Sequence, residues 1–116
     1  MVPVAEVGLA MLEGALKYGR HNYRVSGVRG SVYFDAAMRH LTRWWEGEDI
    51  DPDSGLHHVT KAMASLMVLR DAQLNGMVID DRPPSVPEWA TELNRKAQEL
   101  VDGCEEPLLP FTRGMK

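Results

Sequence analysis

Four segments of the chain repeat their apolar residues every three or four positions, which is the spacing that one face of an α-helix requires. The expected helices cover about residues 4–18, 31–45, 56–74 and 85–103. No segment gives a convincing strand pattern. Because 116 residues leave room for only one sizeable core, we expect an all-α protein, a small four-helix bundle-type domain.

The ends of these helices are marked by glycine, asparagine and proline. Asn75 and Gly76 predict the stop of the third helix. Residues 85–88 predict a capping box with proline in the first turn of the fourth helix. We therefore expect a single helical domain over residues 1–103 and a C-terminal tail over residues 104–116, which carries two prolines.

The first expected helix carries more apolar side chains than one face needs. Leu9, Leu12 and Leu16 widen its apolar stripe, so we expect it to be buried on most of its girth. A chain of this size buries little surface alone. We therefore expect a homodimer or homotetramer.

Composition excludes several classes of function. The 13 Lys and Arg against 17 Asp and Glu give a net charge of −4, which argues against binding a nucleic acid polymer. A single cysteine permits no intrachain disulfide and suits a reducing compartment. The longest apolar run, residues 62–69, is too short to span a bilayer. We expect a cytoplasmic protein that binds neither membrane nor nucleic acid polymer.

One stretch is basic within this acidic chain. Residues 19–30 carry three glycines together with Arg20, His21, Arg24 and Arg29, and Lys17 lies just before them. Glycine lets a backbone approach a ligand, and arginine presents forked donors that match phosphate. The alternative is a solvated flexible loop.

An acidic stretch follows the second expected helix. Five of the eight residues 46–53 are carboxylates, the side chains that Mg²⁺ prefers beside phosphate oxygens. The stretch is not an EF-hand, because its sixth and twelfth positions are Ser54 and Thr60. The alternative is a solvated loop in which Asp53 or Ser54 caps the next helix.

Two further features carry alternatives. His58 and Lys61 lie one helical turn apart and could share a ligand, although a lone helix histidine is more often a packed or capping residue. Trp44 and Trp45 are adjacent, and core packing of one of them is the favoured interpretation. A basic loop, an acidic loop and a His/Lys face together suit a metal-dependent enzyme that acts on a polyphosphate.

Three blocks of sequence occur in an order that resembles a known family. They are GALKYGRHNY at 14–23, YFDAAMRHL at 33–41 and GEDIDPDSGLHH at 47–58. The chain resembles the small phage-type dATP/dGTP diphosphohydrolases, which are grouped with the MazG-like all-α nucleoside triphosphate pyrophosphohydrolases. The resemblance covers about residues 6–75. It implies a self-associating helical bundle that hydrolyses dATP, dGTP or both to the monophosphate and pyrophosphate, with Mg²⁺ or Mn²⁺.

The chain departs from the MazG-like pattern at the metal. That superfamily holds its metal with an ExxE pair on one helix and an ExxD pair on the next, and neither pair is present. Either ligation has moved to Asp35, the acidic loop and histidines, or the site binds nucleotide without the usual cage. The expected metal ligands are Asp35, Glu48, Asp53, His40 and His58.

The expected roles follow from these positions. Asp35 lies opposite the apolar face of its helix and is the first choice as the metal-binding carboxylate, with Asp53 and Glu48 as second choices. The expected catalytic residues are Asp35 and His58. His40 and His58 could instead carry protons. The expected substrate-binding residues are Lys17, Arg20, Asn22, Arg39 and Lys61.

Two other classes of function remain open from the residues alone. One is a non-catalytic nucleotide-binding or regulatory helical oligomer, which the missing carboxylate pairs favour. The other is a structural phage protein without a ligand. For a phage-encoded chain, the expected location is the host cytoplasm.

Overall fold

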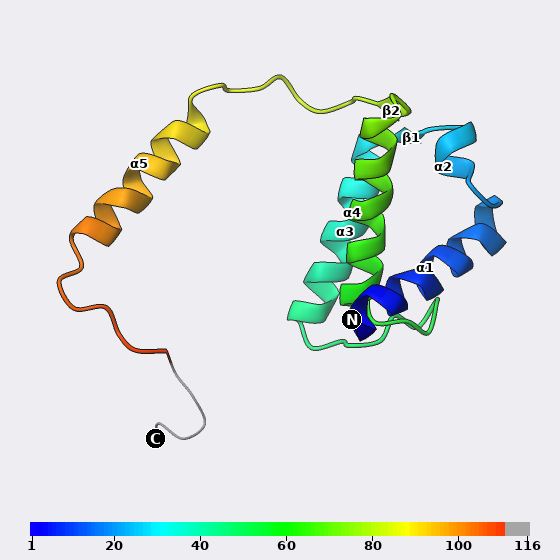
Figure 1. Cartoon of the computed structure of the whole chain (residues 1–116), viewed down its shortest axis with the longest axis horizontal. Helices are drawn as coiled ribbons and strands as arrows, with labels where there is room; N and C mark the ends of the chain where they lie inside the picture. The colour runs from blue at the N-terminus through cyan, green and yellow to red at the C-terminus, as the bar shows by residue number, and fades with distance from the viewer. Residues whose placement is uncertain (111–116) are drawn as a thin grey trace. The chain divides into compact units, whose positions relative to one another are not determined.

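The computed structural model describes residues 1–110, and the end of the expected tail, residues 111–116, lies outside the described residues. The elements in chain order are α1 (Val2–Tyr18), α2 (Asn22–Val25), β1 (Val28–Arg29), α3 (Gly30–Trp45), α4 (His58–Leu74), β2 (Val78–Ile79) and α5 (Trp89–Asp102), as Figure 1 shows. The chain is mostly helical. The four long helices match the four that the periodicity predicts.

Two of the predicted helix starts are wrong. The residue that precedes α4 is His57, because Asp51 draws Ser54 Oγ and the Asp53 amide into a turn at 2.8 and 3.2 Å before the helix begins. The residue that precedes α5 is Glu88, and no side chain caps that end. The predicted capping box at residues 85–88 is therefore absent.

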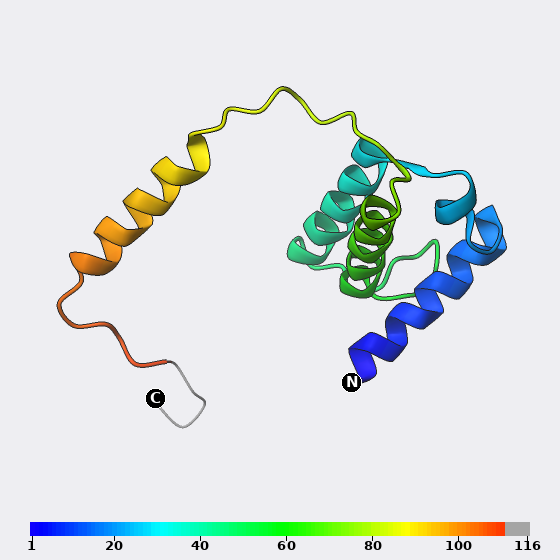
Figure 2. The same ribbon diagram turned by 45° about the horizontal axis from the view of Figure 1, so that its top comes forward.

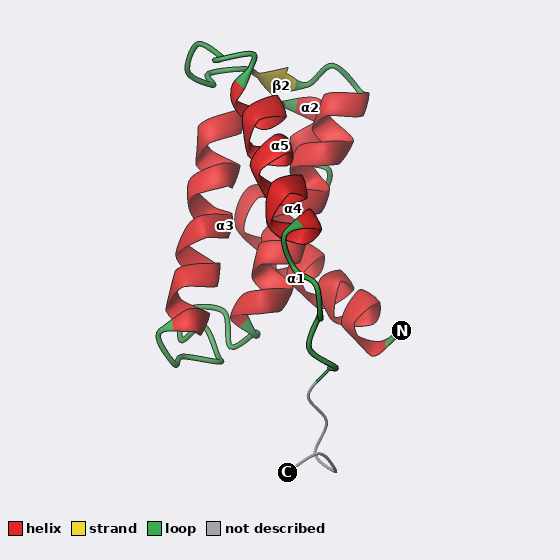
Figure 3. Cartoon of the chain, turned by 90° about the vertical axis from the view of Figure 1, so that its left-hand side faces the viewer, coloured by secondary structure: helices red, strands yellow, loops and turns green. Residues whose placement is uncertain are grey.

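A small parallel sheet was not predicted. β1 and β2 pair Val28 with Val78 and Arg29 with Ile79, and Figure 3 shows β2 beside the end of α4. Gly27 has a φ of +78°, and a Cβ there would lie 2.7 Å from the Met77 carbonyl oxygen. Only glycine fits this approach. Strands of two residues are too short to show any alternation.

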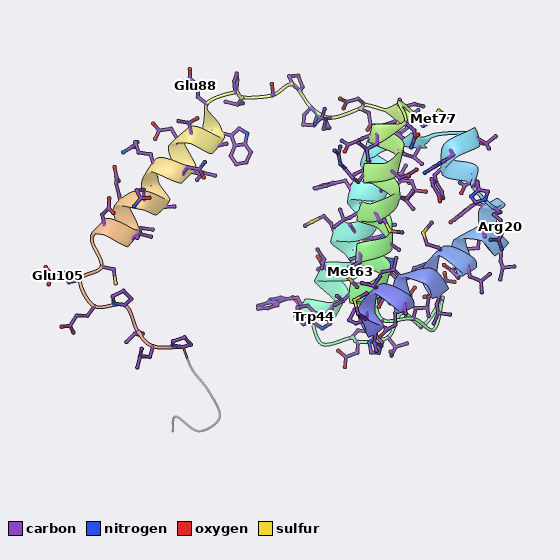
Figure 4. The ribbon with its side chains drawn as sticks, in the orientation of Figure 1. Arg20, Trp44, Met63, Met77, Glu88 and Glu105 are labelled. Carbon is purple, nitrogen blue, oxygen red and sulfur yellow. The ribbon has the colours of Figure 1, made fainter. Side chains whose placement is uncertain are left out.

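Contacts divide the chain into two units, Met1–Pro83 and a second that begins at Pro84. In the first unit, α3 and α4 pack side by side as an antiparallel hairpin, and α1 crosses α4 (Figures 1 and 2). One apolar cluster joins Val7 and Ala10 of α1 to Ala64 of α4. Figure 4 shows Met63, which packs on this cluster, at that crossing, and Met77 at the opposite end of α4.

The basic stretch is not one continuous loop. Residues 22–25 form α2, which Arg24 ties to α4 through two hydrogen bonds to Asp71, at 3.0 and 2.7 Å. The start of α3 is capped from a distance, because the Ser31 amide donates to Asp81 Oδ1 at 2.8 Å. Both contacts join residues about fifty positions apart: the first fixes α2 of the basic stretch onto α4, and the second joins the start of α3 to the segment after β2.

The buried apolar side chains of the described chain are all small, namely Val7, Ala10, Val28, Ala37, Ala62, Ala64, Val68 and Ala72. Alanine lets helices approach closely. Many of the large side chains that the periodicity placed in the core remain at the surface, as Phe34 and Leu66 show at 59% and 50% exposure. The sequence pattern therefore identifies apolar faces that the single chain does not bury.

Two specific burial predictions are wrong for the single chain. Leu9 and Leu16 are 53% and 81% exposed, because α1 contacts α4 along one narrow stripe that contains Val7 and Ala10. Trp44 and Trp45 are also exposed and lie against each other, with ring centroids 6.1 Å apart. Neither tryptophan packs in a core.

The second unit contains α5. None of its residues is buried, and its apolar positions, Leu93 and Leu100 among them, are exposed. The domain expected over residues 1–103 stays a prediction. Among the described residues, no helix has the length and apolar character that crossing a membrane requires.

Candidate functional site

A cleft of about 780 Å³ opens in the first unit between α1, α2, α3 and α4. This volume lies within the range of small-ligand sites. Its walls include Gly8 to Tyr23 at most positions, the Gly27–Arg29 segment, one side of α3 and one side of α4. The acidic loop adds Asp51 and Asp53.

The cleft concentrates positive charge. Three carboxylates line it, Glu13, Asp51 and Asp53, against six basic side chains: Lys17, Arg20, Arg29, Arg39, Arg43 and Lys61. The whole chain has a net charge of −4, so this balance is local. A hollow with one sign of charge attracts ligands of the other sign.

All five residues that the sequence predicted to bind substrate line this cleft, namely Lys17, Arg20, Asn22, Arg39 and Lys61. They come from α1, the turn after it, α2, α3 and α4. Figure 4 shows Arg20 just beyond the end of α1. Within the described chain, Arg20 and Arg39 have no carboxylate partner within ion-pair distance.

The two lysines are held by a carboxylate that the sequence analysis missed. Lys17 Nζ and Lys61 Nζ lie 2.7 and 2.5 Å from the two oxygens of Glu13. Burial raises the pKa of this carboxyl, but the lysines outweigh burial and hold the pKa below its usual value. Glu13 lies one turn before Lys17, and that spacing was the available signal.

Asp51 is the other missed residue. It is 4% exposed and accepts hydrogen bonds from Ser54 Oγ and the Asp53 amide. Burial raises the pKa of Asp51, but these hydrogen bonds outweigh burial and hold the pKa below its usual value. The carboxyl therefore stays ionised. Because Asp51 folds the loop, the acidic stretch is an ordered wall of the cleft.

A chain of hydrogen bonds runs from the cleft wall into the protein. His40 Nδ1 lies 2.8 Å from His58 Nδ1, and His58 Nε2 lies 2.7 Å from Glu48 Oε1. Arg43 Nε is 2.9 Å from the same Glu48 oxygen. His58 is fully buried, whereas His40 lines the cleft.

These contacts define what each histidine can do. Both ring nitrogens of His58 have protein partners, so His58 offers no free lone pair to a metal ion. Burial lowers the pKa of His40; Asp51 opposes this, whereas His58, Lys61 and Arg39 lower the pKa further. The hydrogen bond to His58, followed by the charge of Arg43, holds the pKa of Glu48 low.

The structure separates Asp35 from the cleft. Asp35 is exposed on α3 and lines a shallow hollow together with Met38, Arg39, Thr42 and Arg43. Arg39 and Arg43 are common to this hollow and the cleft. The proposed role of Asp35 as a catalytic and metal-binding group stays a prediction.

The expected metal ligands do not form a ready-made cage. Within residues 1–110, no group of three or more His, Cys, Asp or Glu side chains is placed to hold one ion. Of the two acidic-loop carboxylates among them, Asp53 lines the cleft, with Oδ2 2.7 Å from Lys17 Nζ, and Glu48 does not line it.

Comparison with known proteins identifies one family and one relative. The family described as "dATP/dGTP diphosphohydrolase, N-terminal" matches residues 2–82, which contain the whole cleft. A protein named dATP/dGTP diphosphohydrolase from Salmonella phage PMBT28 is 31% identical over 103 residues, covering 89% of this chain and 35% of that protein. The chain thus spans about a third of this relative's length. No solved structure matches.

Proposed function

Because the chain belongs to the dATP/dGTP diphosphohydrolase N-terminal family, we propose that it hydrolyses a deoxypurine nucleoside triphosphate, dATP or dGTP or both. The proposed products are the monophosphate and pyrophosphate. The observation that carries this proposal is the cleft with six basic side chains in a chain of net negative charge. A triphosphate is the part of such a substrate that needs this many positive charges.

The basic side chains have distinct roles in this proposal. Arg20 and Arg39, which have no carboxylate partner in the described chain, bind phosphate oxygens directly. Lys17 and Lys61 already hold Glu13 and are therefore oriented before the substrate arrives. Asn22 donates to a sugar or phosphate oxygen. Each charge-assisted contact contributes about 1.5–3 kcal/mol.

A divalent cation is also part of the proposal. The described residues do not fit a cage in which the protein alone holds the ion, because no three ligand side chains converge. Mg²⁺ in nucleotide sites is commonly held by one or two carboxylates and by the phosphates. We therefore place Mg²⁺ or Mn²⁺ on the triphosphate as part of the substrate, with Asp53 as the carboxylate that meets it.

Self-association completes the proposed arrangement. The large apolar side chains of α1, α3 and α4 are exposed, whereas the buried ones are small. Exposed apolar patches of this kind mark interfaces, and a second copy carries the same faces. We propose a homodimer or homotetramer that acts in the cytoplasm, where its nucleotide substrate is found.

The test is turnover of dATP and dGTP by the full chain with Mg²⁺ or Mn²⁺, with the products separated by chromatography. Release of the monophosphate and pyrophosphate supports the proposal, and release of single phosphate contradicts the assigned bond. A matched control is the variant that replaces both Arg20 and Arg39 with glutamine, which should lose turnover and keep its melting temperature.

A second candidate is a nucleotide-binding or regulatory oligomer without turnover. The lack of three converging metal ligands among residues 1–110 favours it. Equilibrium binding of dGTP with no product after prolonged incubation with either cation would select this candidate.

A further inference from the structure

The hydrogen bonds between Glu48, His58 and His40 determine which nitrogens carry protons. Glu48 Oε1 has two neighbours, His58 Nε2 at 2.7 Å and Arg43 Nε at 2.9 Å. An ionised carboxylate only accepts hydrogen bonds, and arginine only donates them. His58 Nε2 therefore carries a proton and donates it to Glu48.

This proton fixes the rest of the chain when His58 is neutral. A neutral ring with a proton on Nε2 has a lone pair on Nδ1. His40 Nδ1, 2.8 Å away, must then be the donor. Consequently His40 Nε2 has a lone pair, and no described residue hydrogen-bonds to this atom.

We propose that His40 Nε2 is the general base of the proposed hydrolysis, and that His58 and Glu48 are positioning residues that hold His40 in this tautomer. The inference rests on the proposed function. As the water oxygen bonds to phosphorus, its proton moves to His40 Nε2. The bond from that phosphorus to the oxygen bridging the α and β phosphates breaks, and the electron pair leaves with the departing group.

The other polar groups of the cleft are less suited to this role. Glu13 lies between two lysines, and Asp53 is paired with Lys17. Asp51 accepts hydrogen bonds on both of its oxygens. His21 is exposed, and no described residue hydrogen-bonds to its ring. Among these described groups, His40 combines a position on the cleft wall with a ring that a hydrogen bond to His58 holds in place.

The first test observes the tautomer directly. The chain has four histidines, so ¹⁵N spectra of histidine-labelled protein can be assigned with the single variants H21Q, H40Q, H57Q and H58Q. We expect His40 to be protonated on Nδ1 and His58 on Nε2. A proton on His40 Nε2 in the resting protein would overturn the proposal. Selective broadening of His40 by Mn²⁺ alone would also overturn it, because Nε2 would then be a metal ligand.

The second test uses a conservative pair at Glu48. In Glu48→Gln the amide oxygen should take the Oε1 position, because Arg43 can only donate there. His58 then keeps its acceptor and His40 keeps its tautomer. Glu48→Ala removes the acceptor. We expect Glu48→Ala to lose the Nδ1–H signal of His40 and to lower kcat with little change in KM, and Glu48→Gln to retain both. Equal behaviour of the two variants would contradict a positioning role.

The third test is turnover by His40→Gln, with melting temperature as the measure of folding. We expect kcat to fall about 10²–10⁴-fold, as for loss of a general base. Unchanged turnover in a folded His40→Gln protein overturns this inference and leaves the proposed function intact. Absence of turnover in the unmodified chain instead overturns the proposed function, and the tautomer measurement shows whether the hydrogen-bond chain exists.

Discussion

Lys17 and Asp53, 36 residues apart in the chain, meet in an ion pair with 2.7 Å between Nζ and Oδ2. The pair joins the last turn of α1 to the acidic loop, and both residues line the cleft. Asp53 and Glu13 together raise the pKa of Lys17, so the lysine side chain remains charged. A phosphate that binds Lys17 must compete with Asp53.

Asp53→Asn should therefore strengthen binding of inorganic tripolyphosphate when no divalent cation is present. The substitution removes a competing negative charge and leaves Lys17 free to bind phosphate. Isothermal titration calorimetry at low salt measures this, and Asp49→Asn, at an exposed position in the same loop, is the control. Weaker binding in Asp53→Asn than in Asp49→Asn would mean that Asp53 orients Lys17 rather than competing for it.

Lys61→Met should weaken nucleotide binding. The substitution keeps most of the packing of the side chain on α4 but removes one charge-assisted contact with phosphate, worth about 1.5–3 kcal/mol. The expected result is a higher dissociation constant for dGTP, read by the same calorimetry. Arg70→Met, at an exposed position outside the cleft on the same helix, should bind as the unmodified chain does. Equal affinities for the two variants would place Lys61 outside the phosphate site.

Asp71→Asn should destabilise the chain at pH 7 and have a smaller effect at pH 3. The hydrogen bond from Arg24, together with its charge, lowers the pKa of Asp71 from 3.8. A carboxyl with a lowered folded-state pKa contributes stability above its unfolded pKa, and this contribution is lost as the pH falls through the folded value. The pair is partly exposed, so screening by solvent keeps the expected loss of stability small.

Urea denaturation at the two pH values measures this difference. Asp80→Asn is the control, because within residues 1–110 Asp80 pairs only with Arg82 two residues away and joins no two helices. A loss of stability in Asp71→Asn that is equal at both pH values would exclude the charge of the pair as its cause.

Asp35→Asn separates the sequence-based prediction from the geometry of the cleft. The position of Asp35, opposite the apolar face of its helix and directly after the basic stretch, predicts abolished turnover. Its exposed place in a hollow outside the cleft indicates instead that the reaction proceeds without it, and we expect turnover to be retained. Loss of turnover at saturating Mn²⁺, with an unchanged melting temperature, would restore Asp35 to the catalytic site.

Helix positions followed from the sequence, but the buried faces did not. Periodicity locates a helix whatever it packs against, so α1, α3 and α4 were found. It assigns the face with the largest apolar side chains to the core, whereas α4 buries alanines together with His58 and Thr60. The chain's own contacts are made by small residues that carry little hydrophobic signal.

Some residues of the candidate site were likewise found from the sequence, and others were not. Lys17 and Arg20 were found because a basic stretch stands out in an acidic chain. Glu13 resembles an ordinary polar position on a helix, and only the crossing of α1 over α4 brings it to Lys61. The contact between Glu48 and His58 depends on the loop folding back, with the His58 amide donating to the Asp49 carbonyl at 2.9 Å. No local pattern encodes these long-range contacts.

The exposed face of α1 predicts the effect of charge on assembly. Leu9 and Leu16 lie two turns apart, are exposed and do not line the cleft. The variant that replaces both with lysine should dissociate the proposed oligomer, because burying two ammonium groups against an apolar partner is costly. Sedimentation velocity should show a smaller species. Val25→Lys, at an exposed position of α2 outside the proposed interface, is the control and should sediment as the unmodified chain. An unmodified chain that sediments as a monomer at every concentration would contradict the interface.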